Sequence, residues 1–218
     1  MRKSCFAVSF CFTLAFPTGL LSQEIVIAAL GDSLTQGFGL PVNDGFVPQL
    51  QSWLDDAGAD VRLINAGVSG DTTAGGLARV GWTLTSDVDG MIVALGGNDL
   101  LRGLPPEEAR TNLTGILQAA AQADVEILLI GMEAPSNFGP AYKAAFDAIY
   151  PDLAAAYDTL FLDSFFAGLM NDGERPDLSE LRAFFQPDGI HPNAAGVSKI
   201  VDRIGPEVLK LVQQINTD

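Results

Sequence analysis

The segment Glu24-Ile25-Val26-Ile27-Ala28-Ala29-Leu30-Gly31-Asp32-Ser33-Leu34 runs from an unbroken apolar stretch directly into a glycine-containing turn. A short apolar stretch rich in β-branched residues is typical of a strand that is buried on both faces. We therefore expect a first strand over Glu24–Leu30. Four shorter segments of the same kind predict four more strands, at Val61–Asn65, Met91–Leu95, Val125–Ile130 and Leu160–Leu162.

Helical patterns lie between the expected strands, for example in the stretch that follows Pro105-Pro106. A second helix is expected to end or bend at Pro151, because proline removes a backbone donor and crowds the preceding turn. A last helix is expected to begin after Asn193, a good N-terminal cap, and to be interrupted at Gly205-Pro206. This alternation predicts an α/β fold, a three-layer α/β/α sandwich around a five-stranded parallel sheet.

The composition is that of an acidic globular chain. Twelve Lys and Arg residues stand against 27 Asp and Glu residues, which gives a formal net charge of −15. Nucleic acids and anionic lipid headgroups bind clustered Lys and Arg, so both classes of partner are disfavoured. The apolar fraction is 48%, and about 195 residues remain after a leader, which fits a single domain. We place this domain at residues 23–218.

The first 22 residues have the order of a secretory signal peptide, in which Arg2-Lys3 precedes an apolar run that ends at Pro17-Thr18-Gly19. We expect cleavage after Ser22 and a periplasmic or secreted protein; an uncleaved anchor is the alternative. Both cysteines lie in this leader, which excludes disulfides and cysteine catalysis in the exported part. With one histidine, a zinc site of nitrogen and sulfur ligands is excluded too, whereas a carboxylate site for a hard cation is not.

The single histidine, His191, limits imidazole chemistry to one loop. A neutral imidazole is well suited to take a proton from a serine hydroxyl near pH 7, and Asp188, three residues earlier, is placed to fix its tautomer. Ser33 follows the first expected strand, Gly67 the second and Asn98 the third. Because the carboxyl ends of parallel strands meet at one edge of the sheet, these residues are expected to converge there.

Each motif taken alone has a purely structural interpretation. Gly-Asp-Ser is a common turn, a glycine loop such as the one at Gly67 is often a tight strand-to-helix connection, and Asn98 can satisfy local backbone groups. The chain also lacks the Gly-x-Ser-x-Gly elbow of the α/β-hydrolases, so Ser33 must be presented by a different turn. The functional interpretation therefore depends on the four segments occurring together.

Together these segments resemble the four sequence blocks of the SGNH hydrolase superfamily, also called GDSL esterases and lipases. The resemblance runs from about Glu24 to the C-terminus, and within the superfamily the chain is most similar to the bacterial periplasmic group of thioesterases, lysophospholipases and arylesterases. It implies a flavodoxin-like fold. The matching blocks are Gly31-Asp32-Ser33-Leu34, Gly67 in its loop, Gly96-Gly97-Asn98-Asp99 and Asp188-Gly189-Ile190-His191-Pro192.

The resemblance also implies a role for each matching residue. Ser33 is implied as the nucleophile, His191 as the general base and then acid, and Asp188 as the group that orients His191. The N–H groups of Ser33 and Gly67 and the amide of Asn98 are implied as the oxyanion hole. The segment after Asn98 is implied as a lid beside the acyl group. Two sets of side chains are then expected to line the acyl site: Leu100, Leu101 and Leu104 in the lid, and Glu133, Pro135 and Phe138 opposite.

The leading hypothesis is a secreted serine ester hydrolase that cleaves short to medium acyl esters and thioesters, and lysophospholipids, through an acyl-enzyme. One alternative keeps the same residues and makes the enzyme a carbohydrate O-acetyl esterase, although three leucines in the lid favour an apolar acyl chain. A remote alternative is a non-catalytic doubly wound binding module. We expect no cofactor, no metal, no obligate protein partner and, after cleavage of the leader, no stable membrane insertion.

Overall fold

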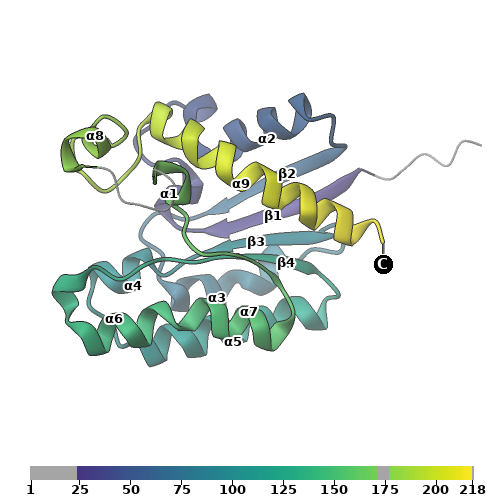
Figure 1. Ribbon diagram of the computed structural model, residues 1–218. Helices are drawn as coiled ribbons and strands as arrows, with labels where there is room; N and C mark the ends of the chain where they lie inside the picture. The colour runs from purple at the N-terminus through teal and green to yellow at the C-terminus, as the bar shows by residue number, and fades with distance from the viewer. Residues whose placement is uncertain (1–23, 171–176, 218) are drawn as a thin grey trace, which may run out of the picture.

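The computed structural model describes residues 24–170 and 177–217, and it contains a five-stranded, fully parallel sheet in the order β2-β1-β3-β4-β5 (Figure 1). The five predicted strands are all present, and their ends agree with the prediction to within two residues. The expected leader, residues 1–22, lies outside the described residues. The strands are β1 (Ile25–Gly31), β2 (Val61–Gly67), β3 (Gly90–Ala94), β4 (Glu126–Ile130) and β5 (Leu160–Leu162).

Helices cover both faces of the sheet, which confirms the predicted three-layer α/β/α sandwich. Figure 1 shows α2 and α9 on one face and α3, α5, α6 and α7 on the other. The α-helices are α1 (Ser33–Gln36), α2 (Phe46–Asp56), α3 (Thr73–Thr83), α4 (Gly97–Leu101), α5 (Pro106–Gln122), α6 (Pro140–Asp147), α7 (Ile149–Tyr157), α8 (Leu178–Arg182) and α9 (Ala194–Ile215). Short 3₁₀ turns are η1 (Val42–Asp44), η2 (Ser136–Phe138) and η3 (Ala167–Leu169).

The central strands are apolar because helices bury them from both sides. Every residue of β1 and β3 is buried, and four of the five residues of β4 are buried, whereas the edge strand β2 is partly exposed. Removal of this apolar surface from water is the main source of stability for such a core. The buried strands therefore form a rigid base for the loops at their carboxyl ends.

Two prolines act differently from the sequence prediction. The helical pattern breaks at Ala148, and Pro151 lies in the first turn of α7, where a missing backbone N–H costs little. The predicted interruption at Gly205-Pro206 is wrong, because α9 runs continuously from Ala194 to Ile215. Its apolar face continues past the proline with fully buried Val208 and Leu211, so packing outweighs the lost hydrogen bond. The predicted cap is confirmed: the Asn193 side chain accepts from the N–H of Gly196 at 3.0 Å.

The strand order creates a crevice beside β1. From β1 the chain moves to β2 on one side and then crosses to β3 on the other, and ligands bind at such switch points beyond the carboxyl ends of the strands. Gly31 at the end of β1 pairs with Gly67 of β2 and with Ala94 of β3. Three strand ends therefore lie side by side at this edge. Within residues 24–170 and 177–217, no helix is long and apolar enough to cross a membrane.

The close contact between α9 and α2 predicts a cost for a larger residue at position 205. A Cβ added to Gly205 would lie 2.5 Å from the Trp53 ring, so we expect Gly205→Ala to lower the free energy of unfolding by about 1–3 kcal/mol. Gly81→Ala is the matched control, because a Cβ there meets nothing within 4 Å in helix α3, and we expect it to raise stability by up to about 1 kcal/mol. Urea unfolding of both variants measures the difference; equal effects would contradict the packing argument.

Candidate active site

Three residues predicted to act together form a hydrogen-bonded chain at the carboxyl edge of the sheet. His191 Nε2 lies 2.9 Å from Ser33 Oγ, and His191 Nδ1 lies 2.7 Å from Asp188 Oδ2. Ser33 and His191 are 158 positions apart in sequence. The fold thus brings a hydroxyl, an imidazole and a carboxylate into the order that a serine nucleophile requires.

Ser33 is presented by a sharp turn from strand to helix. Asp32 caps the one-turn helix α1 by accepting a hydrogen bond from the N–H of Leu34 at 3.0 Å. The turn also needs Gly31, since a Cβ there would overlap the Thr35 hydroxyl and would lie 2.9 Å from the carbonyl of Ala94. This one-turn helix takes the place of the absent Gly-x-Ser-x-Gly elbow.

Asp188 is held as an ionised acceptor. Its Oδ2 accepts from His191 Nδ1, and its Oδ1 accepts from the backbone N–H groups of Ile190 at 2.9 Å and His191 at 3.0 Å. The hydrogen bond with the His191 side chain, followed by these two backbone bonds, lowers the pKa of Asp188 to about 2. An ionised Asp188 favours the tautomer with the proton on Nδ1, which leaves Nε2 free to accept the Ser33 proton.

The loop that carries His191 is fixed by its neighbours. The Phe38 ring lies 4.7 Å from the imidazole ring, centroid to centroid. Gln186 Nε2 donates to the carbonyls of Phe38 at 2.8 Å and Pro192 at 3.0 Å, and the backbone N–H of Gln186 donates to the carbonyl of His191 at 2.8 Å. These contacts limit rotation of the imidazole away from Ser33.

Two of the predicted oxyanion donors, the N–H of Gly67 and the amide of Asn98, lie at neighbouring strand ends and donate to other groups of the protein. The N–H of Gly67 donates to Asn65 Oδ1 at 3.0 Å. Asn98 Nδ2 donates to the carbonyl of Asp71 at 2.9 Å and to Asp32 Oδ2 at 3.2 Å. A bound oxyanion must therefore replace or share these acceptors. Gly67 is required for close packing as well, because a Cβ there would overlap the backbone of Gln36.

Comparison with known proteins shows the family of the chain. The chain matches the GDSL-like Lipase/Acylhydrolase family over residues 29–198. It belongs to this family. The resemblance predicted from the four sequence blocks is thereby confirmed.

Individual relatives agree with this membership. Esterase TesA of Pseudomonas aeruginosa is 36% identical over 197 residues, covering 88% of this chain and 94% of the relative. Thioesterase 1/protease 1/lysophospholipase L1 of Escherichia coli (strain K12) is 34% identical over 184 residues, covering 84% of this chain and 83% of the relative. The crystal structure of AlinE4, an SGNH-hydrolase family esterase, superposes with a TM-score of 0.69 at 44% identity, covering 87% of this chain and 97% of that chain. The protein is a carboxylic ester hydrolase.

Asp32 is a site residue of this GDSL-like hydrolase that the sequence interpretation missed. Its side chain is buried and lies between the Ser33 turn and the Asn98 amide. Burial raises the pKa of Asp32 to about 6, although hydrogen bonds from Leu34 and Asn98 and the charge of His191 act in the opposite direction. The sequence signal was available: a carboxylate directly follows a wholly apolar strand, at the edge where a parallel sheet forms its sites.

Arg79 was also missed, and it ties two strand ends together. From helix α3 its guanidinium donates to the carbonyls of Ala66 at 2.6 Å and Gly31 at 2.8 Å, and to Asp71 Oδ2 at 2.6 Å. The carbonyl of Asp71 in turn accepts from Asn98. A planar guanidinium with several donors suits such a clamp, because it reaches several acceptors in a fixed geometry.

Tyr150 supports the turn that carries Asn98. Its buried hydroxyl donates to the carbonyl of Leu95 at 2.9 Å. The next residue, Gly96, has φ +116°, and a Cβ there would overlap this hydroxyl. Asp99 holds the far side of the turn by accepting from both the N–H and the hydroxyl of Thr73. The position of the Asn98 amide is thus set from helices α3 and α7.

The residues expected to line an acyl site differ in their exposure to solvent, so they do not form one surface. Leu100 is buried in the core, Leu101 is exposed and Leu104 is partly buried. Phe138 stacks on Tyr142 at 4.9 Å, and the Tyr142 hydroxyl donates to the carbonyl of Leu104 at 2.7 Å. The predicted lid and the Phe138 segment are therefore adjacent.

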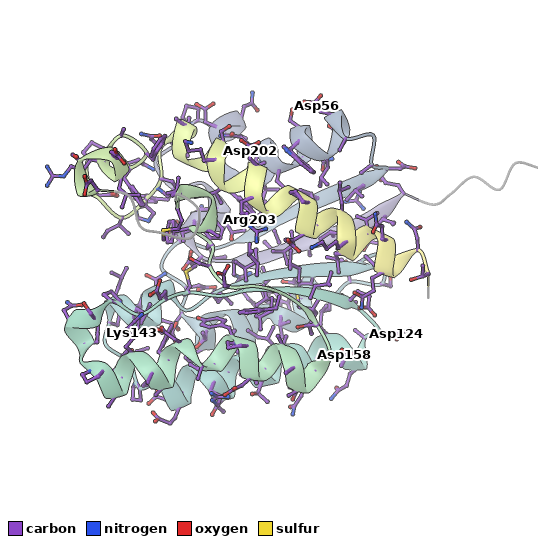
Figure 2. The ribbon with its side chains drawn as sticks, in the orientation of Figure 1. Asp56, Asp124, Lys143, Asp158, Asp202 and Arg203 are labelled. Atoms are coloured by element: carbon purple, nitrogen blue, oxygen red, sulfur yellow. The ribbon has the colours of Figure 1, made fainter. Side chains whose placement is uncertain are left out.

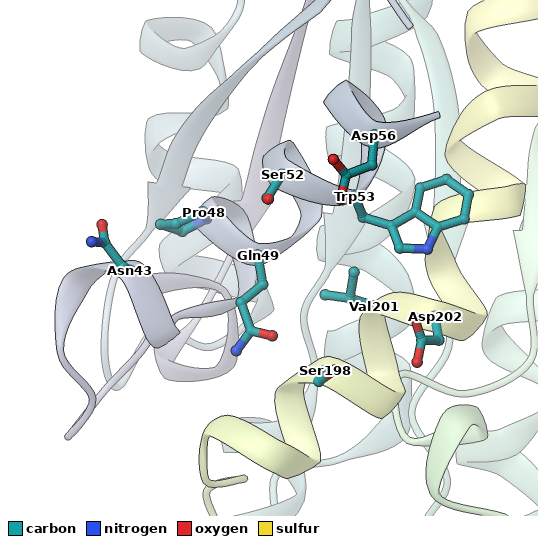
Figure 3. A pocket seen from close by; sticks show the side chains of 9 residues that line it. All are labelled: Asn43, Pro48, Gln49, Ser52, Trp53, Asp56, Ser198, Val201 and Asp202. Carbon is teal, nitrogen blue, oxygen red and sulfur yellow. The ribbon is translucent and has the colours of Figure 1, made fainter. Parts of the chain in front are cut away.

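Glu133 and Pro135 line a separate cavity of about 560 Å³. Lys143 and Arg203, which Figure 2 shows in opposite helix layers, also line it. A second cavity, of about 440 Å³, lies between α2 and α9, and none of the predicted site residues lines it (Figure 3).

Among the described ranges, 24–170 and 177–217, no group of three or more His, Cys, Asp or Glu side chains is placed to hold a metal ion.

The raised pKa of Asp32 predicts a stability that depends on pH. The unfolded carboxyl ionises near 3.8 and the folded one near about 6, so the folded state holds the proton more tightly. This contribution is fully present below about pH 4 and is lost as the pH rises through about 6, a change of about 3 kcal/mol. Asp32→Asn removes this dependence, so its stability relative to the natural protein should rise between pH 4 and pH 8.

Urea unfolding at both pH values measures this effect. Asp56→Asn is the control for loss of one carboxyl charge, because Asp56 is exposed on α2. We expect the Asp56 variant to follow the natural protein at both pH values. A stability difference between Asp32→Asn and the natural protein that is the same at pH 4 and pH 8 would contradict the assigned pKa.

Proposed function

We propose that this carboxylic ester hydrolase acts through Ser33 in two steps. The supporting observation is the continuous chain from Ser33 Oγ through His191 to Asp188, with contacts of 2.9 and 2.7 Å. In the first step Ser33 Oγ attacks the carbonyl carbon while His191 Nε2 takes the hydroxyl proton. The bond to the leaving group then breaks, and His191 returns the proton to the leaving alkoxide or thiolate.

The second step releases the acid. Water attacks the acyl-Ser33 carbonyl and passes a proton to His191, which then protonates Ser33 Oγ as the acyl bond breaks. Asp188 stays ionised and stabilises the imidazolium in both steps, which agrees with its lowered pKa. The two steps together consume one ester or thioester and one water, and they release one acid and one alcohol or thiol.

Negative charge develops on the carbonyl oxygen in both steps. We assign its stabilisation to the N–H groups of Ser33 and Gly67 and the amide of Asn98. In the free protein Gly67 and Asn98 donate to Asn65, Asp71 and Asp32. These hydrogen bonds hold both donors near the site before substrate arrives, and the developing oxyanion replaces or shares their present acceptors.

The substrate class that we propose is short to medium acyl esters and thioesters, including aryl esters and lysophospholipids. The names of the Pseudomonas aeruginosa and Escherichia coli relatives support esters, thioesters and lysophospholipids, and the name of the arylesterase of Vibrio mimicus supports aryl esters. Leu101 and Leu104 beside the Asn98 turn, with Phe138 near them, offer apolar contacts to an acyl chain. Hydrolysis of nitrophenyl esters of increasing chain length, compared with deacetylation of acetylated xylan, tests this choice; preference for the sugar would overturn it.

We also propose that residues 1–22 direct export and that residues 23–218 act as one domain in the periplasm or outside the cell. The charged and apolar segments of the leader support export. N-terminal sequencing of the protein recovered from the periplasmic fraction checks this proposal, and we expect it to begin at Gln23.

The role of Ser33 predicts covalent labelling by a fluorophosphonate ester. We expect one label per chain at Ser33 and none in Ser33→Ala, because the His191 contact makes this hydroxyl nucleophilic. Mass spectrometry locates the label. Ser69→Ala, at another serine on the same edge, is the control and should label fully. Folded natural protein that takes up no label would exclude the proposed mechanism.

The oxyanion role of Asn98 predicts a loss in kcat with little change in KM. Loss of one such donor typically lowers kcat by about 100- to 1000-fold, because the interaction forms with the developing charge. Asn98→Ala is compared with Asn43→Ala, which removes an exposed amide from η1 and should leave both constants unchanged. A raised KM at unchanged kcat would assign Asn98 to ground-state binding instead.

A further inference from the structure

Exposed apolar side chains gather around the Ser33–His191 contact. Among the described residues six large apolar side chains are exposed, and five of them lie in the segments that follow β1, β2 and β3 or in the loop that carries His191. The sixth, Trp82, is 88% exposed near the C-terminal end of α3, away from the carboxyl edge of the sheet. The five, which we name the apolar rim, are Phe38, Val42, Val68, Leu101 and Ile190.

Ring contacts, hydrogen bonds and chain positions place rim residues beside Ser33, Asn98 and His191. Phe38 lies against the His191 ring, and Ile190 precedes His191 in the chain. The N–H of Val68 donates to the carbonyl of Gly31, two residues before Ser33. Leu101 ends the helix that begins at Gly97, next to Asn98. Four of the rim residues therefore lie beside the groups that we assign to the reaction, and Val42 follows Phe38 by four positions in the same connecting segment.

The rim loops are held rigid while their side chains point to solvent. The carbonyl of Val42 accepts from the N–H of Gly45, and Arg102, next to Leu101, donates to the carbonyl of Gly70 at 2.7 Å. Val42 is 81% exposed and Leu101 is 63% exposed. Their apolar surface contributes little to the core, and apolar surface gathered at one place on a protein marks an interaction site.

The charge of the same loops selects the kind of surface that fits. Arg102 is the one Lys or Arg in residues 37–45, 68–72, 99–104 and 186–193, and Asp44, Asp71 and Asp188 lie in the same segments. The chain as a whole carries a net charge of −15. An anionic lipid surface would be repelled, whereas a neutral zwitterionic one would not. Apolar side chains around an acidic site therefore suit a neutral lipid interface.

We propose that the apolar rim docks the enzyme on the surface of zwitterionic lipid aggregates, so that lipid esters enter the site from the aggregate. This inference rests on the proposed function, because it takes ester-bearing lipids as the occupant. Docking places the acyl chain of a lysophospholipid next to Ser33 without first moving the whole lipid into water. The rim contacts the aggregate, and the acyl site inside it contacts the single lipid.

Binding to vesicles tests the proposal without turnover. In the Ser33→Ala background, sedimentation with phosphatidylcholine vesicles should show binding, and with phosphatidylglycerol vesicles much weaker binding. Val42→Asp, Leu101→Asp and Ile190→Asp should each weaken the phosphatidylcholine partition constant by about tenfold, because a charge enters an apolar contact. Trp82→Asp is the matched control and should change it by less than about twofold. No binding, or an equal loss in Trp82→Asp, would overturn the proposal.

Kinetics separate this inference from the proposed function. Val42→Asp should keep the activity of the natural protein on soluble nitrophenyl butyrate and lose about tenfold in kcat/KM on micellar lysophosphatidylcholine. Activity on the soluble ester without vesicle binding would overturn the docking alone, whereas no activity on either ester would overturn the function. Light scattering excludes another occupant: a natural protein that dimerises, with rim variants that are monomeric, would assign the rim to a second copy of the chain.

Discussion

The buried carboxylate of Asp32 joins the two halves of the active site. One oxygen accepts from the N–H of Leu34 and so holds the helix that presents Ser33, and the other accepts from the amide of Asn98. Burial disfavours the ionised form, and these hydrogen bonds offset part of that cost. Because one side chain contacts both segments, the spacing between Ser33, the proposed nucleophile, and Asn98, the proposed oxyanion donor, depends on it.

The surrounding structure keeps this junction narrow. Gly31 and Gly67 pair at adjacent strand ends and leave no side chains between the turn of Ser33 and its neighbours. Arg79 ties the carbonyls at these ends together, and Tyr150 fixes the turn before Asn98. The parallel sheet alone would bring the loops to one edge. These buried hydrogen bonds then fix the position of each loop relative to its neighbours. This agrees with a mechanism that depends on donors held in advance.

The fold could be predicted because its strands and helices have strong local patterns, and the Ser33, His191 and Asp188 contacts could be predicted because the four sequence blocks occur together. Apolar strands alternate with helical patterns, and a single histidine leaves one place for imidazole chemistry. Arg79 was missed because its role is long-range: an arginine on a helix looks ordinary until the strands are assembled. Asp32 had a local signal in its position directly after an apolar strand, but its contact with Asn98 is long-range. The continuity of α9 through Pro206 was missed for the same reason, since contact with α2 and the buried Val208 and Leu211 outweigh the local preference of proline.

The division between Leu100 in the core and Leu101 at the surface has a similar origin. The sequence interpretation predicted both leucines in one apolar lid. They are consecutive residues of helix α4, so their side chains leave the helix in different directions. One leucine therefore stabilises the turn that carries Asn98, while the other faces what approaches the site. Hydrophobic residues near an active site serve both purposes, and only the assembled fold separates them.

The most direct test of the account follows the one imidazole of the chain by NMR alongside the pH dependence of kcat/KM. We predict that the neutral form of His191 carries its one ring proton on Nδ1. We also predict that Asp32→Asn and the natural protein both lose kcat/KM at the pH where this imidazole becomes protonated. An activity profile that does not follow the imidazole titration in either protein would contradict the assignment of His191 as the base.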